Sequence, residues 1–212
     1  MPSFLSRHSA HFEVTHSLWR NNIDLACNGN TIYHVETAQM TLRGPHLTFH
    51  AGQDFSAPVV GVCKFKHFSS DIELGIGNPS RPNSMRWDRL THEGVFSIRY
   101  SFRVAFGGGS AETFTWKKAS MGTGIAGNLT LVRERDQKVV AVFSSKSGFT
   151  RKSELDIYGE SYGPQFEFMV VPTPSLFCFL LSQIASTKIC LSPLALQRSY
   201  ALAVRDTHEG PP

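Results

Sequence analysis

The chain has 212 residues, of which 18% are charged and 41% are hydrophobic, and its formal net charge is +4. This length suits one domain with a sizeable core, and the composition is that of an ordinary globular protein, not a disordered or fibrous one. The mild positive charge permits an anionic partner but does not require one.

The cysteines and the first residues suggest a compartment. Cys27, Cys63, Cys178 and Cys190 show neither C-x-x-C spacing nor a zinc pattern. We therefore expect reduced thiols in a cytoplasmic protein. Residues 1–10 lack the apolar core of a signal peptide, and we expect a flexible N-terminus there.

Most of the chain reads as short β-strands bounded by glycine, proline and asparagine. The expected strands are 11–19, 31–37, 46–50, 59–66, 71–76, 84–90, 95–104, 112–117, 128–133, 138–143 and 153–158. Trp87 and Trp116 lie in two of these strands and are expected in the core. Short strands at this spacing are typical of a sandwich or a barrel.

The segment 166–187 is the most apolar part of the chain. Residues 166–171 are mostly aromatic or β-branched and predict a twelfth, buried strand. Thr173 is a candidate N-cap with Pro174 at the first helical position, which predicts a helix over 174–187. That helix is apolar on every side, so it must be enclosed by protein or lipid.

These elements predict a mostly β fold, a closed antiparallel barrel of about twelve strands that encloses a C-terminal hydrophobic helix. The barrel with its helix is expected over residues 11–187. Residues 188–212 are expected to be an atypical, poorly ordered tail.

Several stretches resemble the tubby C-terminal-like superfamily, which includes tubby-like proteins, plant LURP-one-related proteins and phospholipid scramblases. The resembling stretches are 46–52, 58–65, 87–88, 114–117, 131–132, 139–143, 155–159 and 166–169. Their local sequence is most similar to that of uncharacterised fungal members. The resemblance implies a barrel around a hydrophobic helix and kinship with lipid-binding domains. The phosphoinositide-binding lysines and arginines of tubby proteins have no positional match here.

Patterns that would indicate catalysis, a cofactor or a metal are weak. Residues 122–127 spell G-x-G-x-x-G, but an expected strand follows instead of the helix that a dinucleotide site requires. His46 and His50 share a strand face near Asp54, yet a metal site needs three or four converging ligands. No nucleophile with a positioned base is evident, so we expect a non-enzymatic protein with no cofactor and no metal.

Basic residues on two successive hairpins form the candidate site. These residues are Arg133, Arg135, Lys138, Lys146, Arg151 and Lys152. If the loops gather on one face, they would attract phosphoinositide headgroups at the inner face of a membrane. The alternative is that these charges only keep strand ends soluble. Nucleic acid is a less favoured partner because base-stacking aromatics do not accompany the basic residues.

Three functional hypotheses follow. The first is a peripheral module that binds anionic membrane lipids, including phosphoinositides, through the basic loops. The second is an intracellular protein-interaction or structural domain without a small ligand. The third is a scramblase-like membrane protein in which residues 166–187 reach lipid, although the helical part is shorter than the roughly 20 residues that a span needs. The oligomeric state stays open.

Overall fold

The computed structural model describes residues 10–17, 22–38, 45–66, 70–94, 98–106, 110–119, 129–145, 152–159 and 162–178. The chain divides into two compact units, residues 1–175 and 176–212. In the second unit the described residues are 176–178, which are helical. The strands and helix α1 belong to the first unit.

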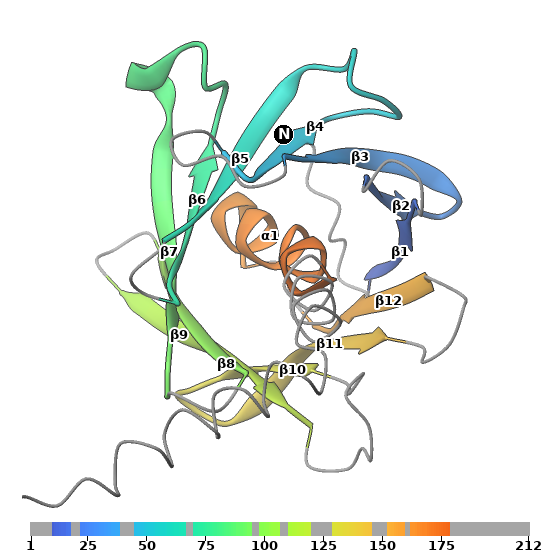
Figure 1. Cartoon of the computed structure of the whole chain (residues 1–212). Coiled ribbons are helices and arrows are strands. Elements are labelled where there is room, and N and C mark those ends of the chain that lie inside the picture. The colour runs from blue at the N-terminus through green and yellow to red at the C-terminus, as the bar shows by residue number, and fades with distance from the viewer. Residues whose placement is uncertain are drawn as a thin grey trace, which may run out of the picture. The chain divides into compact units, whose positions relative to one another are not determined.

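The first unit is a closed antiparallel barrel of twelve strands (Figure 1), so the predicted fold class is confirmed. The strands are β1 (Ala10–His16), β2 (Ile23–Cys27), β3 (Asn30–Thr37), β4 (Leu47–His50), β5 (Val59–Phe65), β6 (Ile72–Ile76), β7 (Arg86–His92), β8 (Arg99–Ala105), β9 (Ala111–Lys118), β10 (Leu129–Arg133), β11 (Lys138–Ser145) and β12 (Lys152–Ile157). A short 3-10 helix, Pro82–Ser84, lies between β6 and β7.

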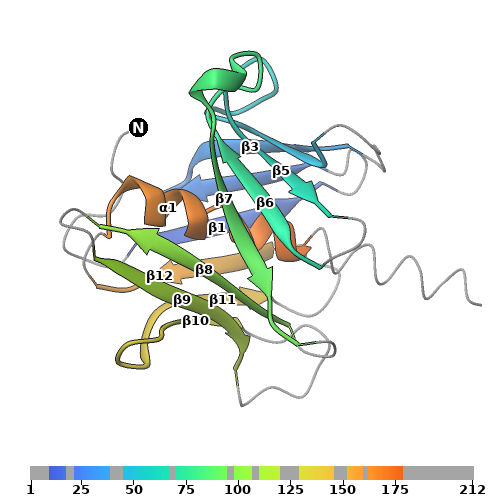
Figure 2. The same cartoon turned by 90° about the vertical axis from the view of Figure 1, so that its left-hand side faces the viewer.

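Each strand pairs with its neighbours in chain order, and β1 pairs with β12 to close the ring. Pairing between β7 and β8 is the most limited in the described ring, because it joins only Thr91 to Ser101 and His92 to Tyr100. Beyond these pairs the two strands diverge (Figure 2). Side chains that alternate along the strands fill the core, and the largest fully buried ones include Trp116, Phe12 and Phe49.

Strand β2 was not expected from the sequence. Its partner β3 follows through a two-residue turn in which Asn28 has φ 52° and Gly29 has φ 76°. Positive φ at both central residues is the geometry of a type I′ hairpin, which Asn-Gly strongly favours. The turn therefore sets the register that places Ile23 and Leu25 in the core.

The predicted strand over 166–171 is wrong, because these residues belong to helix α1 (Pro164–Val170). Gly163, with φ 89°, ends the preceding extended chain, and Pro164 takes a first-turn position where its missing N–H costs nothing. A short buried apolar run has no periodicity that separates strand from helix. Residues 173–178 are also helical, and the rest of the predicted 174–187 helix lies outside the described residues, as does the tail 188–212.

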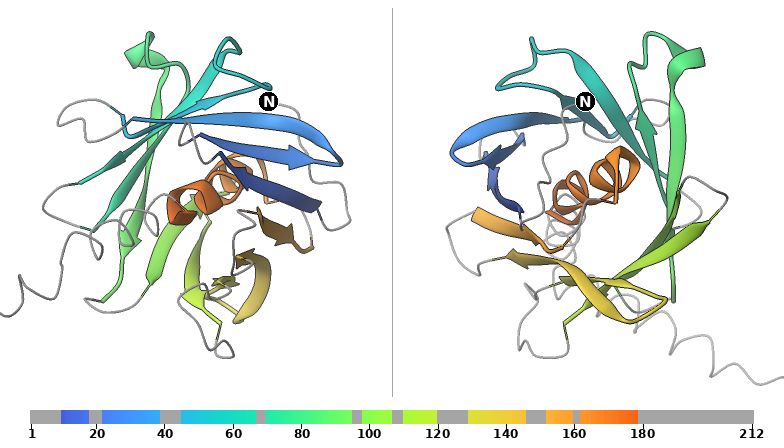
Figure 3. Two further views of the ribbon diagram at one scale, coloured as in Figure 1. Left: turned by 45° about the vertical axis from the view of Figure 1, so that its right-hand side comes forward. Right: turned by 180° about the vertical axis from the view of Figure 1, so that it is seen from behind.

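Aromatic rings of α1 contact strands on two sides of the ring. The Phe166 centroid lies 4.9 Å from that of Phe114 on β9, and the Phe168 centroid lies 6.4 Å from that of Phe49 on β4. In the ring order, β8, β7, β6 and β5 separate β9 from β4. Helix α1 therefore packs against buried side chains from two well-separated parts of the barrel wall (Figure 3).

Candidate functional site

The structure splits the predicted basic site between the two ends of the barrel. Arg133, Arg135 and Lys138 lie around the β10–β11 turn, whereas Lys152 opens β12 beside the far end of β11, where Ser145 pairs with Ser153. Strand β11 has eight residues, which separates the two groups by about 25 Å. Lys146 and Arg151 lie outside the described residues. Successive turns of an antiparallel ring lie at opposite ends, so Lys152 does not meet the β10–β11 turn.

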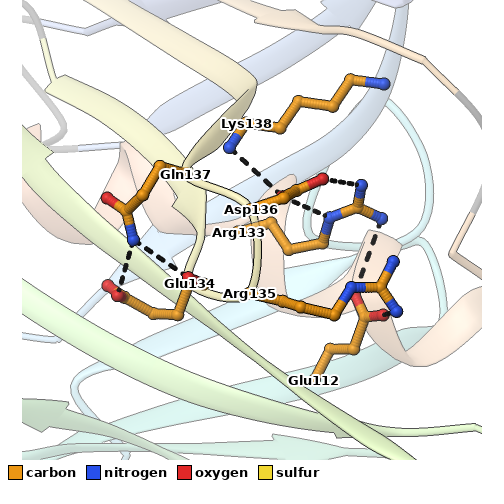
Figure 4. Close-up of polar contacts among 7 residues, drawn as sticks. All are labelled: Glu112, Arg133, Glu134, Arg135, Asp136, Gln137 and Lys138. Atoms are coloured by element: carbon orange, nitrogen blue, oxygen red, sulfur yellow. Dashed lines mark hydrogen bonds and ion pairs between the residues drawn. The ribbon is translucent and has the colours of Figure 1, made fainter.

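Carboxylates engage both arginines at the β10–β11 turn (Figure 4). Arg133 donates to the Asp136 carboxylate through Nε at 2.9 Å and Nη2 at 2.5 Å. Glu112, on β9, lies 2.9 Å from Nη1 of Arg135 and 3.7 Å from Nη1 of Arg133. The Arg133 guanidinium also lies over the Tyr162 ring, 5.6 Å from its centroid. These contacts pair both arginines of the turn within the protein.

Most of the charge at this turn is compensated. Asp136 and Glu112 pair with Arg133 and Arg135, Glu134 lies 3.8 Å from Arg99 on β8, and within the described chain no carboxylate pairs with the Lys138 ammonium. The hydrogen bonds from Arg133 lower the pKa of Asp136 to about 2, and those same bonds raise the pKa of Arg133. The two arginines therefore stay paired through the neutral pH range and offer an anionic surface little attraction.

A more basic surface lies on the outer face of β5, β6 and β7. Trp87 was expected in the core, but its side chain is 43% exposed, because Trp87 alternates with the inward-facing Asp88 and Leu90. Its ring lies against Gly75 on β6, where an added Cβ would come 3.0 Å from the indole. The Nζ of Lys64 stands 4.8 Å from the ring centroid. Glycine opposite tryptophan is the sequence signal that could have indicated this exposed ring.

Basic residues exceed acidic ones around Trp87. Among the described residues between 59 and 92 there are five lysines and arginines and three acids. The basic residues are Lys64, Lys66, Arg81, Arg86 and Arg89. Arg86 lies on the same side of β7 as Asp88, with its Nε 3.3 Å from that carboxylate. We call the other four, with Trp87, the Trp87 surface. Lys66 pairs with Glu73 at 2.7 Å, and Arg86 and Arg89 also lie near carboxylates. Within the described chain no carboxylate pairs with Lys64 or Arg81.

A histidine pair is buried beneath the β4–β5 loop, residues 51–58. His34 on β3 lies directly opposite His50 on β4, with their ring centroids 6.3 Å apart. His34 Nδ1 is 2.6 Å from Asp24 Oδ1, and His50 Nδ1 donates to the Ala57 carbonyl at 3.0 Å. His50 is only 5% exposed, and its Nε2 has no hydrogen-bond partner, with the Glu36 carboxylate 3.7 Å away.

The histidines do not form the metal site that His46, His50 and Asp54 suggested. His46 lies just before β4, and its Nδ1 accepts the Phe65 N–H, whereas His50 is at the other end of that strand. In the described ranges no three His, Cys, Asp or Glu side chains are arranged to hold a metal. Burial raises the pKa of the Cys63 thiol well above its ordinary value, which opposes its use as a nucleophile.

Comparison of the chain with protein-family models, with curated proteins and with solved structures gave no match. Within the part of the chain that the structure describes, no helix combines the length and apolar character needed to cross a bilayer.

Proposed function

We propose that this chain is a non-enzymatic binding domain for anionic lipid surfaces and that the Trp87 surface carries the binding. The observation that supports it is the Lys64 ammonium over an exposed indole, without a carboxylate to neutralise it. Tryptophan prefers the membrane–water interface, and a basic residue near an anionic surface contributes about 1 kcal/mol. This site replaces the predicted set at 133–152, whose described arginines are paired within the protein.

The tubby C-terminal-like resemblance is part of the proposal. We propose that α1 fills the barrel, as the hydrophobic helix does in that superfamily. The contacts of Phe166 and Phe168 with strands from separate parts of the wall support this arrangement. A cytoplasmic protein of this architecture would meet anionic lipid at the inner face of a membrane.

Vesicle co-sedimentation tests the proposal. We expect the protein to sediment with phosphatidylcholine vesicles that contain phosphatidylserine, at low salt and less so at high salt, because surface charge attraction is screened. Lys64→Ala should weaken the binding about fivefold, which corresponds to about 1 kcal/mol, and Trp87→Ala should weaken it further. A parallel series with phosphoinositide-containing vesicles of equal total charge distinguishes general charge attraction from recognition of the headgroup.

The β10–β11 turn provides the matched control. Arg135→Ala removes one cation, as Lys64→Ala does, but that cation lies 2.9 Å from the Glu112 carboxylate. We expect this variant to bind as the wild type does. Equal losses in both variants, or no binding of the wild type at low salt, would contradict the proposal.

A second candidate function is the binding of an extended protein segment, and the limited β7–β8 pairing favours it. From Arg86 to Leu90, β7 is paired with β6 but not with β8. A strand edge with free backbone groups can accept an extended peptide as an added strand. Arg86 and Arg89 on this strand would favour an acidic segment.

A further inference from the structure

The β4–β5 loop, residues 51–58, is firmly ordered by its own hydrogen bonds. Ala51 N donates to Pro58 O at 2.9 Å, and Ala57 N donates to Asp54 O at 3.2 Å. The Asp54 carboxylate accepts from Ser56 N at 2.8 Å and from Ser56 Oγ. The two sides of the loop touch, because a Cβ added at Gly52 would lie 2.6 Å from the Cβ of Ala57.

His50 fastens this loop to the barrel wall. The imidazole is buried on β4, and its Nδ1 donates to the carbonyl of Ala57 on the far side of the loop. The loop thus projects from a fixed base.

At the tip of this ordered loop, Phe55 is 68% exposed, more than any other large hydrophobic side chain in the described residues. Single exposed apolar residues are common on protein surfaces. Phe55 differs because an ordered loop holds it out from the wall, so its ring contributes little to the barrel core. Removal of its exposed area from water would favour association with an apolar environment.

A basic loop projects from the same end of the barrel. The β6–β7 connection, residues 77–85, leaves the same end as the β4–β5 loop, and both protrude there in the views of Figures 2 and 3. Gly77 N donates to Val60 O at 2.8 Å, which ties the second loop to β5. Its charged residue, Arg81, is exposed and has no carboxylate partner in the described chain. The charged residue of the first loop, Asp54, is turned onto Ser56.

We propose that Phe55 is an apolar anchor that enters the lipid headgroup layer while Arg81 contacts the lipid phosphates. This inference rests on the proposed function and assigns a second part to its binding surface. An apolar ring and a cation on two loops at one end of the barrel suit a bilayer interface, where the ring reaches acyl chains and the cation stays at phosphate level. The ordered loop lowers the entropy lost on insertion.

Two variants test the anchor on phosphatidylcholine–phosphatidylserine vesicles. Phe55→Ala should weaken co-sedimentation about tenfold and should leave the thermal unfolding midpoint unchanged, since the ring is exposed. The difference in binding between Phe55→Ala and the wild type should persist at high salt, because salt does not screen the transfer of an apolar ring. In Phe55→Trp, the added indole emission should shift to shorter wavelength with vesicles and be quenched by brominated lipid. Gln53→Trp, in the same loop, is the matched control and should shift less.

The outcomes separate this inference from the proposed function. If the wild type binds vesicles but Phe55→Ala binds equally well and Phe55→Trp emission does not shift, the anchor is wrong and the Trp87 surface stands. If the wild type does not bind vesicles at low salt, the proposed function and the anchor fail together. Vesicle binding by the wild type, with a blue shift that is larger in Phe55→Trp than in the wild type or in Gln53→Trp, supports both.

Discussion

Gly61 and Gly75 show how a single missing side chain shapes each side of the wall. On the side that faces α1, the position of a Gly61 Cβ is only 2.3 Å from the Phe168 ring and 2.9 Å from the Gly75 carbonyl oxygen. Outside, the position of a Gly75 Cβ is 2.5 Å from the terminal methyl of Met85 and 3.0 Å from the Trp87 ring. The first clash involves packed core and backbone, whereas the second involves side chains at the surface.

We expect Gly61→Ala to lower the free energy of unfolding by about 1–3 kcal/mol, the usual effect of overpacking a core. Gly75→Ala should cost less, because the Met85 methyl can move, and should instead displace the Trp87 ring. Urea unfolding of both variants measures the difference. Equal stability of Gly61→Ala and the wild type would show that Phe168 does not pack against β5.

Residue-level expectations were right for one tryptophan and wrong for another. Trp116 was expected to be buried and is, but Trp87 was assigned to the core because strand propensity does not say which face is buried. The basic residues at 133–138 were expected to attract anionic lipid headgroups. Their pairing involves Glu112, which is far from them in sequence and comes into contact only through the register of β9 and β10.

At the scale of elements, helix α1 takes the place of the expected last strand, 166–171. The barrel still has twelve strands, because β2 was not among those expected. The Asn-Gly turn at 28–29 is a strong hairpin signal, and it required a strand on each side. That signal would have indicated β2, whose five residues show only brief alternation. The helix was less accessible to prediction, since the composition of a buried apolar run fits both states.

Helix α1 should be essential for the stability of the barrel. Phe168→Asp places an uncompensated charge among buried aromatic rings, at a cost of several kcal/mol, and we expect the domain to be unfolded at room temperature. Phe55→Asp makes the same change at an exposed loop and should keep its unfolding midpoint. Circular dichroism during thermal unfolding compares them. Similar midpoints for the two variants would contradict the packing of α1 against the strands.

At the scale of the whole molecule, the ring is uneven. Strands β8 and β9 share seven residue pairs, from Arg99–Lys117 to Ala105–Ala111, whereas β7 and β8 share two. Strand β7 is also among the more exposed strands, with four exposed residues. Both features lower the local stability of this part of the barrel.

Hydrogen exchange should detect this unevenness. We expect amide hydrogens in the first half of β7 to exchange faster than those of β8 that face β9, because opening there breaks fewer tertiary contacts. A peptide-level mass-spectrometry time course is sufficient. Uniform protection across β7, β8 and β9 would show that the ring is sealed at this point and would remove the support for peptide binding there.

The pairing of β1 with β12 also constrains how the protein is made. Ala10 and Ile157 are partners although 147 positions of chain separate them. During synthesis, the edge of β1 that pairs with β12 stays unpaired until β12 has left the ribosome. Contacts of such sequence separation slow folding and prolong the exposure of strand edges. The early hairpins of this protein would therefore be the natural clients of chaperones that bind nascent chains.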